Sequence, residues 1–263
     1  MNSHRYIDTH IHLDDKKFES DRDSVIQSFS GSLDYIINPA VNLASCKKVK
    51  GLTKKYELIY AAYGIHPHDA KDASDNALVT IEELLKDEKS VGVGEIGLDY
   101  HYNFSPKEDQ IRVFKDFLQL AKKINKPVII HNRESDTDML KILEAEYPSG
   151  AVGQFHCFSS TKEMAEILLK MGFHISFTGS ITFTKNRYAE LIEMVPLDKL
   201  LLETDAPYMA PIPFRGQRCD SLMIPHIVKK IAEIKKIDEK IVYNETYNNS
   251  IKLFQLKSNL GNI

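Results

Sequence analysis

The chain has 263 residues, of which 43% are apolar and 27% charged, and its formal net charge is −3. This composition is typical of a globular protein with a sizeable core, and the length suits one large α/β barrel or two average domains. The slight negative charge excludes a chain-wide basic surface for nucleic acid, so any contact with a polyanion has to be made locally.

Neither a membrane span nor a disulfide framework is indicated. No segment approaches the roughly 20 apolar residues that a membrane helix requires, and no apolar signal core follows Met1. The three cysteines, Cys46, Cys157 and Cys219, form no CxxC pair. We therefore expect reduced thiols and a cytoplasmic protein, and nothing indicates a membrane contact or an obligate protein partner.

Eight short runs with β character follow one another along the chain, at 5–9, 34–38, 58–63, 90–95, 127–131, 151–156, 173–178 and 199–204. Between them lie amphipathic stretches such as 107–124 and 161–171, whose apolar residues recur at helical spacing. A capping box of Ser105 and Glu108 is predicted at the start of the first stretch. Two further helices are predicted within residues 222–254.

This alternation of strands and helices predicts a parallel (β/α)8 TIM barrel of the α/β class, formed by residues 1–263 as a single domain. The alternative architecture is a doubly wound open sheet. The sequence contains no Gly-rich dinucleotide motif, low-complexity linker or internal repeat. In a barrel the active site forms where the strands end and the following loops begin, so the residues at those points are candidate catalytic or ligand-binding residues.

Six of the predicted strands end in, or lead into, a histidine or an acidic residue: His10 and His12, His66, Glu95, His131, His156 and Asp205. His10 and His12 point the same way on a strand, because they are two residues apart, and can bind one ion. Without His66, the four imidazoles and two carboxylates suit two divalent ions about 3.5–4 Å apart. We assign His10, His12 and Asp205 to one ion, His131 and His156 to the other, and Glu95 as the bridge.

This ligand set predicts hydrolytic chemistry. A water activated by the two ions would be the nucleophile, and Asp205 would accept its proton or orient it, so Asp205 and Glu95 are the candidate catalytic residues. The identity of the ions stays open among Mg, Mn, Zn and similar metals, because histidine ligation favours Zn or Mn whereas phosphate chemistry often uses Mg.

Five motifs resemble, in order, those of the TatD family of metal-dependent deoxyribonucleases: DTHIHLD (8–14), GEIGLDY (94–100), PVIIHNR (127–133), HCFS (156–159) and ETDAPY (203–208). The resemblance covers residues 6 to about 218. It implies a barrel, a divalent-metal site on the six ligands assigned above, and exonuclease-like hydrolysis of DNA phosphodiesters. One segment departs from the family pattern: 219–222 lacks a proline that usually follows the Arg-Gly-x-Arg stretch, which concerns the substrate-side loop.

Five further residues are candidates for substrate contact: His66, Arg133, Glu203, Tyr100 and Arg215. Arg133 would hold a phosphate oxygen, or form a rim salt bridge with Glu134 or Asp136. His66 would bind the scissile phosphate or protonate the leaving oxygen, the other interpretation being a structural histidine.

Tyr100, together with Tyr102, would stack on a base or serve in packing. Glu203 shares the face of Asp205 and would orient a ligand or bind metal weakly. Arg215 would contact phosphate or lie in a solvated loop. His68 is interpreted as a surface residue.

Three functions are compatible with these candidate residues. The first is a metal-dependent phosphodiesterase acting on DNA or nucleic-acid ends. The second is an amidohydrolase or esterase acting on a small molecule or aminoacyl-RNA with the same metal site. Many such enzymes bridge their metals with a lysine at strand four, where this chain has Glu95. The third is a non-catalytic scaffold, whose sign would be lost ligands, yet the set is complete. The first is the favoured hypothesis.

Overall fold

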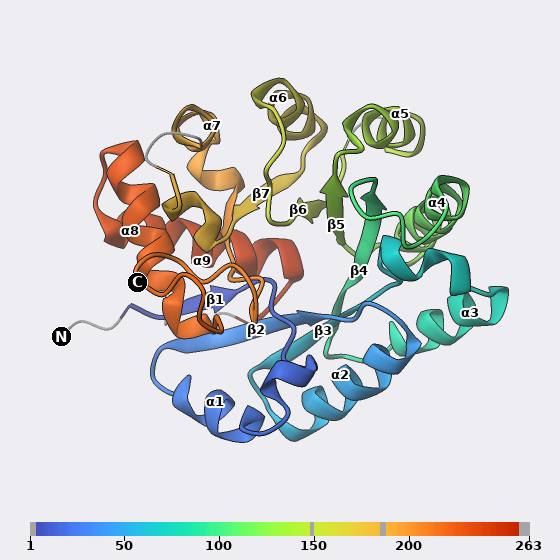
Figure 1. Ribbon diagram of the computed structural model, residues 1–263, viewed down its shortest axis with the longest axis horizontal. Coiled ribbons are helices and arrows are strands. Elements are labelled where there is room, and N and C mark those ends of the chain that lie inside the picture. The colour runs from blue at the N-terminus through green and yellow to red at the C-terminus, as the bar shows by residue number, and fades with distance from the viewer. Residues whose placement is uncertain (1–3, 148–149, 185–187, 258–263) are drawn as a thin grey trace.

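A computed structural model of the chain describes residues 4–147, 150–184 and 188–257. Eight parallel strands form one sheet in which each strand pairs with its neighbours in chain order (Figure 1). The strands are β1 (Tyr6–Asp8), β2 (Leu33–Pro39), β3 (Ile59–Tyr63), β4 (Ser90–Asp99), β5 (Val128–Arg133), β6 (Gly153–Phe155), β7 (His174–Phe177) and β8 (Leu200–Leu202). The predicted (β/α)8 TIM barrel is confirmed.

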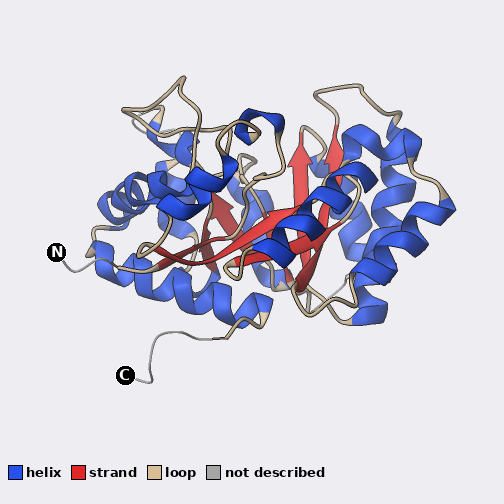
Figure 2. Ribbon diagram, turned by 90° about the horizontal axis from the view of Figure 1, so that it is seen from below, coloured by secondary structure: helices blue, strands red, loops and turns tan. Residues whose placement is uncertain are grey.

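Except for the last, the helices surround the strands on the outside (Figure 2). They are α1 (Arg22–Ser28), α2 (Leu43–Lys55), α3 (Asp75–Leu84), α4 (Lys107–Ile124), α5 (Asp136–Glu146), α6 (Lys162–Met171), α7 (Ala189–Met194), α8 (Ile224–Lys235) and α9 (Glu239–Phe254). The helix predicted at 107–124 is confirmed to the residue. Within the described residues, no helix is both long enough and apolar enough to cross a membrane.

The predicted capping box at Ser105 is wrong. Pro106 takes the N-cap position of α4 and makes no side-chain cap. The Ser105 hydroxyl instead donates to the carbonyl of His68 at 2.7 Å and accepts from the amide of Lys71 at 3.1 Å. Ser105 therefore ties the loop after β4 to the short 3-10 helix η2 (Pro67–Asp72), which leaves its side chain no freedom to cap α4.

Hydrogen bonds between the segments at the C-terminal ends of β1 and β8 join the two edges of the sheet, which rules out the open sheet. The amide of Thr9 donates to the carbonyl of Leu202 at 3.0 Å, and the amide of Asp205 donates to the carbonyl of His10 at 2.9 Å. The buried carboxylate of Asp8 accepts from the amide and hydroxyl of Thr204, at 3.1 and 2.6 Å. This seam brings the start of the chain against residues about 200 positions later.

The barrel interior is filled at its N-terminal end by apolar side chains and by α9, which lies across the centre of the ring in Figure 1. The interior cluster contains Ile7, Tyr35, Ile37, Ala62, Val91, Ile129, Leu201, Tyr247, Leu253, Phe254 and Leu256. A larger cluster packs the outward side chains of the strands against the helices. Because one end of the interior is sealed by this packing, polar side chains gather at the other, C-terminal end.

Candidate metal centre

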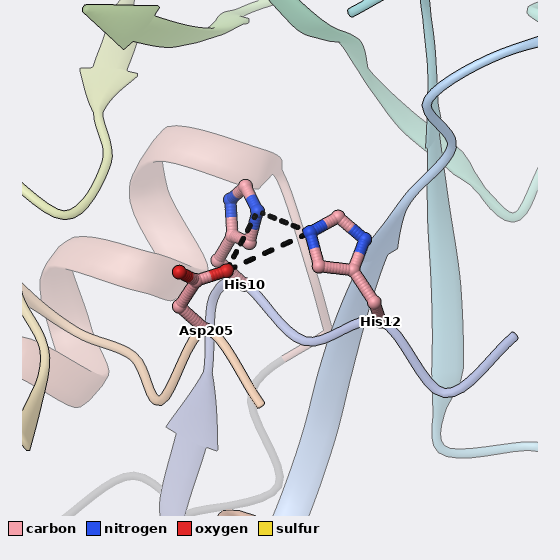
Figure 3. Close-up of side chains that lie close together, drawn as sticks. All are labelled: His10, His12 and Asp205. Carbon is pink, nitrogen blue, oxygen red and sulfur yellow. Dashed lines mark hydrogen bonds and ion pairs between the residues drawn. The ribbon is translucent and has the colours of Figure 1, made fainter. Parts of the chain in front are cut away.

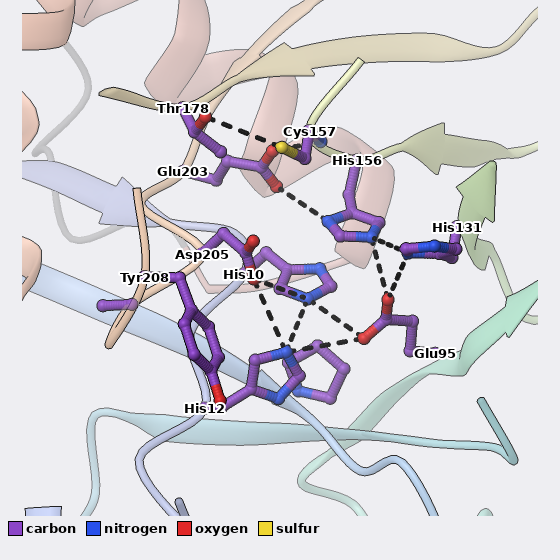
Figure 4. A network of polar contacts seen from close by, with 12 residues as sticks. His10, His12, Glu95, His131, His156, Cys157, Thr178, Glu203, Asp205 and Tyr208 are labelled. Carbon is purple, nitrogen blue, oxygen red and sulfur yellow. Dashed lines mark hydrogen bonds and ion pairs between the residues drawn. The ribbon is translucent and has the colours of Figure 1, made fainter. Parts of the chain in front are cut away.

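The candidate ligands reach the C-terminal end of the barrel from five strands. His10 and His12 follow β1, His156 follows β6, and Asp205 follows β8. His131 lies within β5, and Glu95 lies in the middle of β4. The side chains converge on one another in Figure 4, although they are separated by as many as 195 positions in the sequence.

Two backbone features allow this approach. Gly97 has φ +144°, and a Cβ atom at this position would lie 1.9 Å from the carbonyl oxygen of His131, so only glycine lets β4 run this close to β5. Asp205 has φ 56°, a left-handed conformation that costs an ordinary residue about 1–2 kcal/mol. Its amide is held by the carbonyl of His10, and its carboxylate turns toward His10 and His12 (Figure 3).

The first group of ligand atoms lies around His10 and His12. Their Nε2 atoms are 3.1 Å apart. Asp205 Oδ1 lies 3.9 Å from the first and 3.6 Å from the second, and Glu95 Oε2 lies 3.4 Å from each. Two nitrogens and two oxygens therefore face a common centre.

The second group lies around the other oxygen of Glu95. Oε1 lies 3.0 Å from His131 Nδ1 and 2.9 Å from His156 Nε2, and these two nitrogens are 3.2 Å apart. The imidazoles of His10 and His156 stack with centroids 3.8 Å apart and join the two groups. Glu95 thus directs one carboxylate oxygen to each group, which is the geometry of a bridging ligand.

The spacing of these atoms fits divalent ions. A tetrahedral ion with nitrogen ligands at about 2.1 Å holds its ligand atoms about 3.4 Å apart. The separations in the first group run from 3.1 to 3.9 Å and those in the second from 2.9 to 3.2 Å. Nitrogen and carboxylate oxygen donors are also the combination that Zn and Mn accept.

The protonation states of His10 and Glu95 suit ligands. Burial, together with the neighbouring His156, holds the pKa of His10 well below its ordinary value, so the ring is neutral. Burial acts to raise the pKa of Glu95, but the surrounding histidines outweigh it and hold that pKa well below its ordinary value. Burial raises the pKa of Asp205, so this carboxylate is the more basic of the two.

Asp99 is a site residue that the sequence reasoning did not identify. It is buried at the end of β4, and its Oδ2 lies 3.0 Å from Nε2 of His131 and 3.0 Å from Nε2 of His68. Residues 95 and 99 of a strand face the same way, so a signal existed. It was missed because the strand was predicted to end at residue 95, whereas β4 continues to Asp99.

His66 lies beside the second group, with Nε2 3.4 Å from Glu95 Oε1. Its Nδ1 accepts a hydrogen bond from the amide of His68 at 3.1 Å. Burial lowers the pKa of His66 to about 4, so the ring is neutral and its proton sits on Nε2. His66 therefore presents an N–H donor to the site. His68, interpreted from the sequence as a surface residue, instead supports Asp99.

Glu203 lies beneath the histidines, fully buried in the barrel interior. It accepts from the side-chain amide of Gln154 at 3.0 Å and from the amide of Cys157, and its Oε2 lies 3.9 Å from Nδ1 of His156 (Figure 4). Within the described residues, Nδ1 of His10 and Nδ1 of His156 have no hydrogen-bond partner. Glu203 is thus placed to interact with the candidate ligands from the barrel interior and not with a substrate at the open end of the barrel.

The three remaining candidates lie farther out. The hydroxyl of Tyr100 donates to Asp138 at 2.8 Å, which turns its ring toward α5. The Arg133 guanidinium lies 4.8 Å from the ring centroid of Tyr102. Arg215 is exposed in the loop after β8, with its guanidinium 4.5 Å from the ring of Phe183. The structure thus places Arg133 by an aromatic ring, and brings neither Tyr100 nor Arg215 into the ligand groups.

A TIM barrel with histidines and carboxylates gathered at its C-terminal end is the arrangement of a metal-dependent hydrolase. The model of the family described as TatD related DNase matches residues 7–255. The chain belongs to the TatD family of metal-dependent hydrolases, and the resemblance seen in the sequence is confirmed.

Individual relatives agree with this placement. The chain is 36% identical over 251 residues to the uncharacterized metal-dependent hydrolase YabD of Bacillus subtilis, covering 95% of this chain and 98% of that protein. It is 30% identical over 256 residues to the 3'-5' ssDNA/RNA exonuclease TatD of Escherichia fergusonii, covering 94% and 98%. The crystal structure of the TatD homologue YjjV from Escherichia coli superposes with a TM-score of 0.89 at 31% identity, covering 96% and 98%.

Proposed function

We propose that this hydrolase cleaves phosphodiester bonds at the ends of DNA strands, acting as an exonuclease. The observation that carries the proposal is Glu95, whose two oxygens face two separate groups of ligand atoms. Two divalent ions held on either side of Glu95 would suit an in-line displacement at phosphorus, because they would stabilise the attacking and the leaving oxygen together. The relative named as a 3'-5' ssDNA/RNA exonuclease supports the same class of substrate.

In this proposal His10, His12 and Asp205 would hold one ion, His131 and His156 would hold the other, and Glu95 would contribute one oxygen to each. Two bound divalent ions, of Mg, Mn, Zn or a similar metal, supply Lewis acidity and lower the pKa of a nearby water. The side chains of His12, Asp205 and His131 are 13 to 18% exposed, while His10, Glu95 and His156 are almost covered. The substrate therefore approaches from the side on which His12, Asp205 and His131 are exposed.

The surrounding side chains then have separate tasks. Asp205, whose pKa burial raises, is the group that accepts the proton of the attacking water. Nε2–H of His66 donates to a phosphate oxygen or to the leaving oxygen, because Nδ1 is already occupied by the amide of His68. Arg133 lies at the rim and binds a neighbouring phosphate.

Two broader expectations remain part of the proposal. Residues 1–263 are taken as one domain, since the family match extends over 7–255. A cytoplasmic location is consistent with Cys46, Cys157 and Cys219, which are all free thiols.

The test is cleavage of end-labelled single-stranded DNA by metal-free protein resupplied separately with Mg, Mn, Co or Zn. We expect stepwise shortening of the labelled strand with at least one metal, and none with the Glu95→Gln variant. A panel of amide and carboxylic ester substrates is run on the same preparation. Cleavage of that panel without any cleavage of DNA would replace the nuclease by the amidohydrolase or esterase alternative.

A further inference from the structure

Two aromatic rings stand exposed in the loop between β4 and α4. Tyr102 is 40% and Phe104 56% exposed, although most large apolar side chains of this chain are buried. Their rings stack nearly parallel, with centroids 5.3 Å apart and an interplanar angle of 5°. The two rings therefore form a stacked apolar pair that is exposed to solvent, here called the Tyr102–Phe104 slab. An exposed apolar surface at the mouth of a site indicates contact with a ligand.

The slab is connected to the metal centre through one histidine. The His68 ring meets Phe104 edge-on with centroids 4.8 Å apart, and meets Tyr102 edge-on at 5.5 Å. Nε2 of His68 lies 3.0 Å from Oδ2 of Asp99, the same oxygen that lies 3.0 Å from Nε2 of His131. One carboxylate oxygen thus separates the histidine that supports the slab from a candidate ligand.

A cation lies beside the slab. The Arg133 guanidinium is 4.8 Å from the centroid of Tyr102. The acidic residues nearest to Arg133 in sequence are engaged elsewhere, since Glu134 pairs with His101 and Asp136 accepts from Asn132 and Ser160. Within the described part of the chain, Arg133 forms no ion pair, so its charge is available to an anionic ligand.

The ligand that combines these features is a flat aromatic group joined to a phosphate. The geometry points to the Tyr102–Phe104 slab and Arg133 as a subsite that stacks an unpaired nucleobase of the strand whose phosphodiester is cleaved at the metal centre. This inference rests on the proposed function. A base within a duplex has both faces covered by neighbouring bases, so the subsite favours single strands and frayed ends.

The first test compares short single-stranded oligonucleotides in which each of the last three nucleotides in turn is abasic. We expect one abasic position to raise KM about 5- to 150-fold in the wild type, the range given by the loss of one base–aromatic contact. The Tyr102→Ala/Phe104→Ala double variant should show the raised KM for every oligonucleotide and no further effect of the abasic position. The matched control is Ile241→Ala on α9, where an equally exposed apolar side chain is removed far from the site.

Hydrolysis of an abasic deoxyribose–phosphate–deoxyribose diester, which carries no aromatic group, separates the subsite from the chemistry. This small diester reports on the metal centre, so the double variant should hydrolyse it at nearly the wild-type rate. An equal loss on the small diester and on DNA would mean that the two rings only support the metal centre, and would overturn the subsite. An unchanged KM for DNA would overturn it as well.

A binding measurement decides the subsite even if the nuclease proposal fails. The chain has no tryptophan, so the Phe104→Trp variant carries a single indole fluorophore within the slab. Titration with a single-stranded oligonucleotide in chelator should quench its emission, and a duplex of the same sequence should quench it less. Quenching without cleavage would retain the subsite and reject the nuclease. Cleavage without quenching would do the reverse.

Discussion

Asp99 and His131 interact on the side of the imidazole that faces away from Glu95, with Asp99 Oδ2 3.0 Å from His131 Nε2. Nδ1 of the same ring lies 3.0 Å from Glu95 Oε1. Burial acts to lower the pKa of His131, but the hydrogen bonds to Asp99 and Glu95 outweigh it and raise the pKa to about 9. The two carboxylates therefore favour positive charge at this ring, and Asp99 orients the ring with Nδ1 toward Glu95.

The Asp99→Asn variant should bind divalent metal about 10- to 100-fold more weakly than the wild type, because its neutral amide orients His131 less firmly. Competition with a chelating dye measures this affinity without reference to activity. Asp21→Asn is a suitable control, since it removes a carboxylate that pairs with Arg218 in a surface ion pair. Equal affinities for the wild type and Asp99→Asn would show that the carboxylate does not orient the ligand.

Replacement of Glu95 by Gln should reduce the number of tightly bound ions and lower activity by at least about a hundredfold, because an amide cannot bridge two ions. Asp205→Asn alters only the first group of ligand atoms and should leave the ion held by His131 and His156. Metal content after dialysis distinguishes the two variants. Two tightly bound ions in Glu95→Gln would remove Glu95 from the bridging position.

Gly97→Ala should destabilise the fold by about 3 kcal/mol or more, because the added Cβ would lie 1.9 Å from the carbonyl oxygen of His131 and φ is +144°. Gly51→Ala in α2 is the matched control. A Cβ at that position meets nothing within 4 Å, so this change should stabilise the protein by about 0.5–1 kcal/mol. Urea unfolding of both variants, monitored by circular dichroism, gives the comparison, and similar free energies for the two would contradict it.

Acidification should destabilise the protein through His174 at the start of β7. Burial lowers the pKa of this histidine to about 4, against 6.5 for the ordinary group. Between these two pH values the unfolded chain binds a proton that the folded chain does not, so the free energy of unfolding falls as pH falls from about 6.5 to about 4. His174→Gln should remove about 1–3 kcal/mol of this pH dependence. Unfolding curves at both pH values measure it, and identical pH slopes for the two proteins would refute the assignment.

The strands and the gathering of the six candidate ligands could be predicted because both depend on local patterns. Apolar runs of strand length indicate the strands of the barrel, and the C-terminal ends of those strands lie at the same end of the barrel. Asp99 was missed because β4 continues beyond Glu95, and His68 could not be predicted because its position depends on how η2 packs against that strand.

Side-chain contacts between segments that are distant in the sequence could not be predicted either. Ser105 carries a sequence pattern for capping, but the backbone of η2 lies close enough to take its hydroxyl. Arg133 has acidic neighbours in sequence, yet in the fold Glu134 turns to His101. In both cases a contact with a distant segment replaces the local one, and no window of sequence contains that information.

The seam between β1 and β8 also sets an order in time. Glu95, His131 and His156 belong to neighbouring strands and are complete once residue 156 has been synthesised. The first group of ligand atoms needs Asp205, and the hydrogen bonds of Thr204 to Asp8 span 196 positions. A chain still bound to the ribosome can therefore bring Glu95, His131 and His156 together before Asp205 has been synthesised and can join His10 and His12. In the proposed two-ion centre, full metal loading would therefore require the closed barrel.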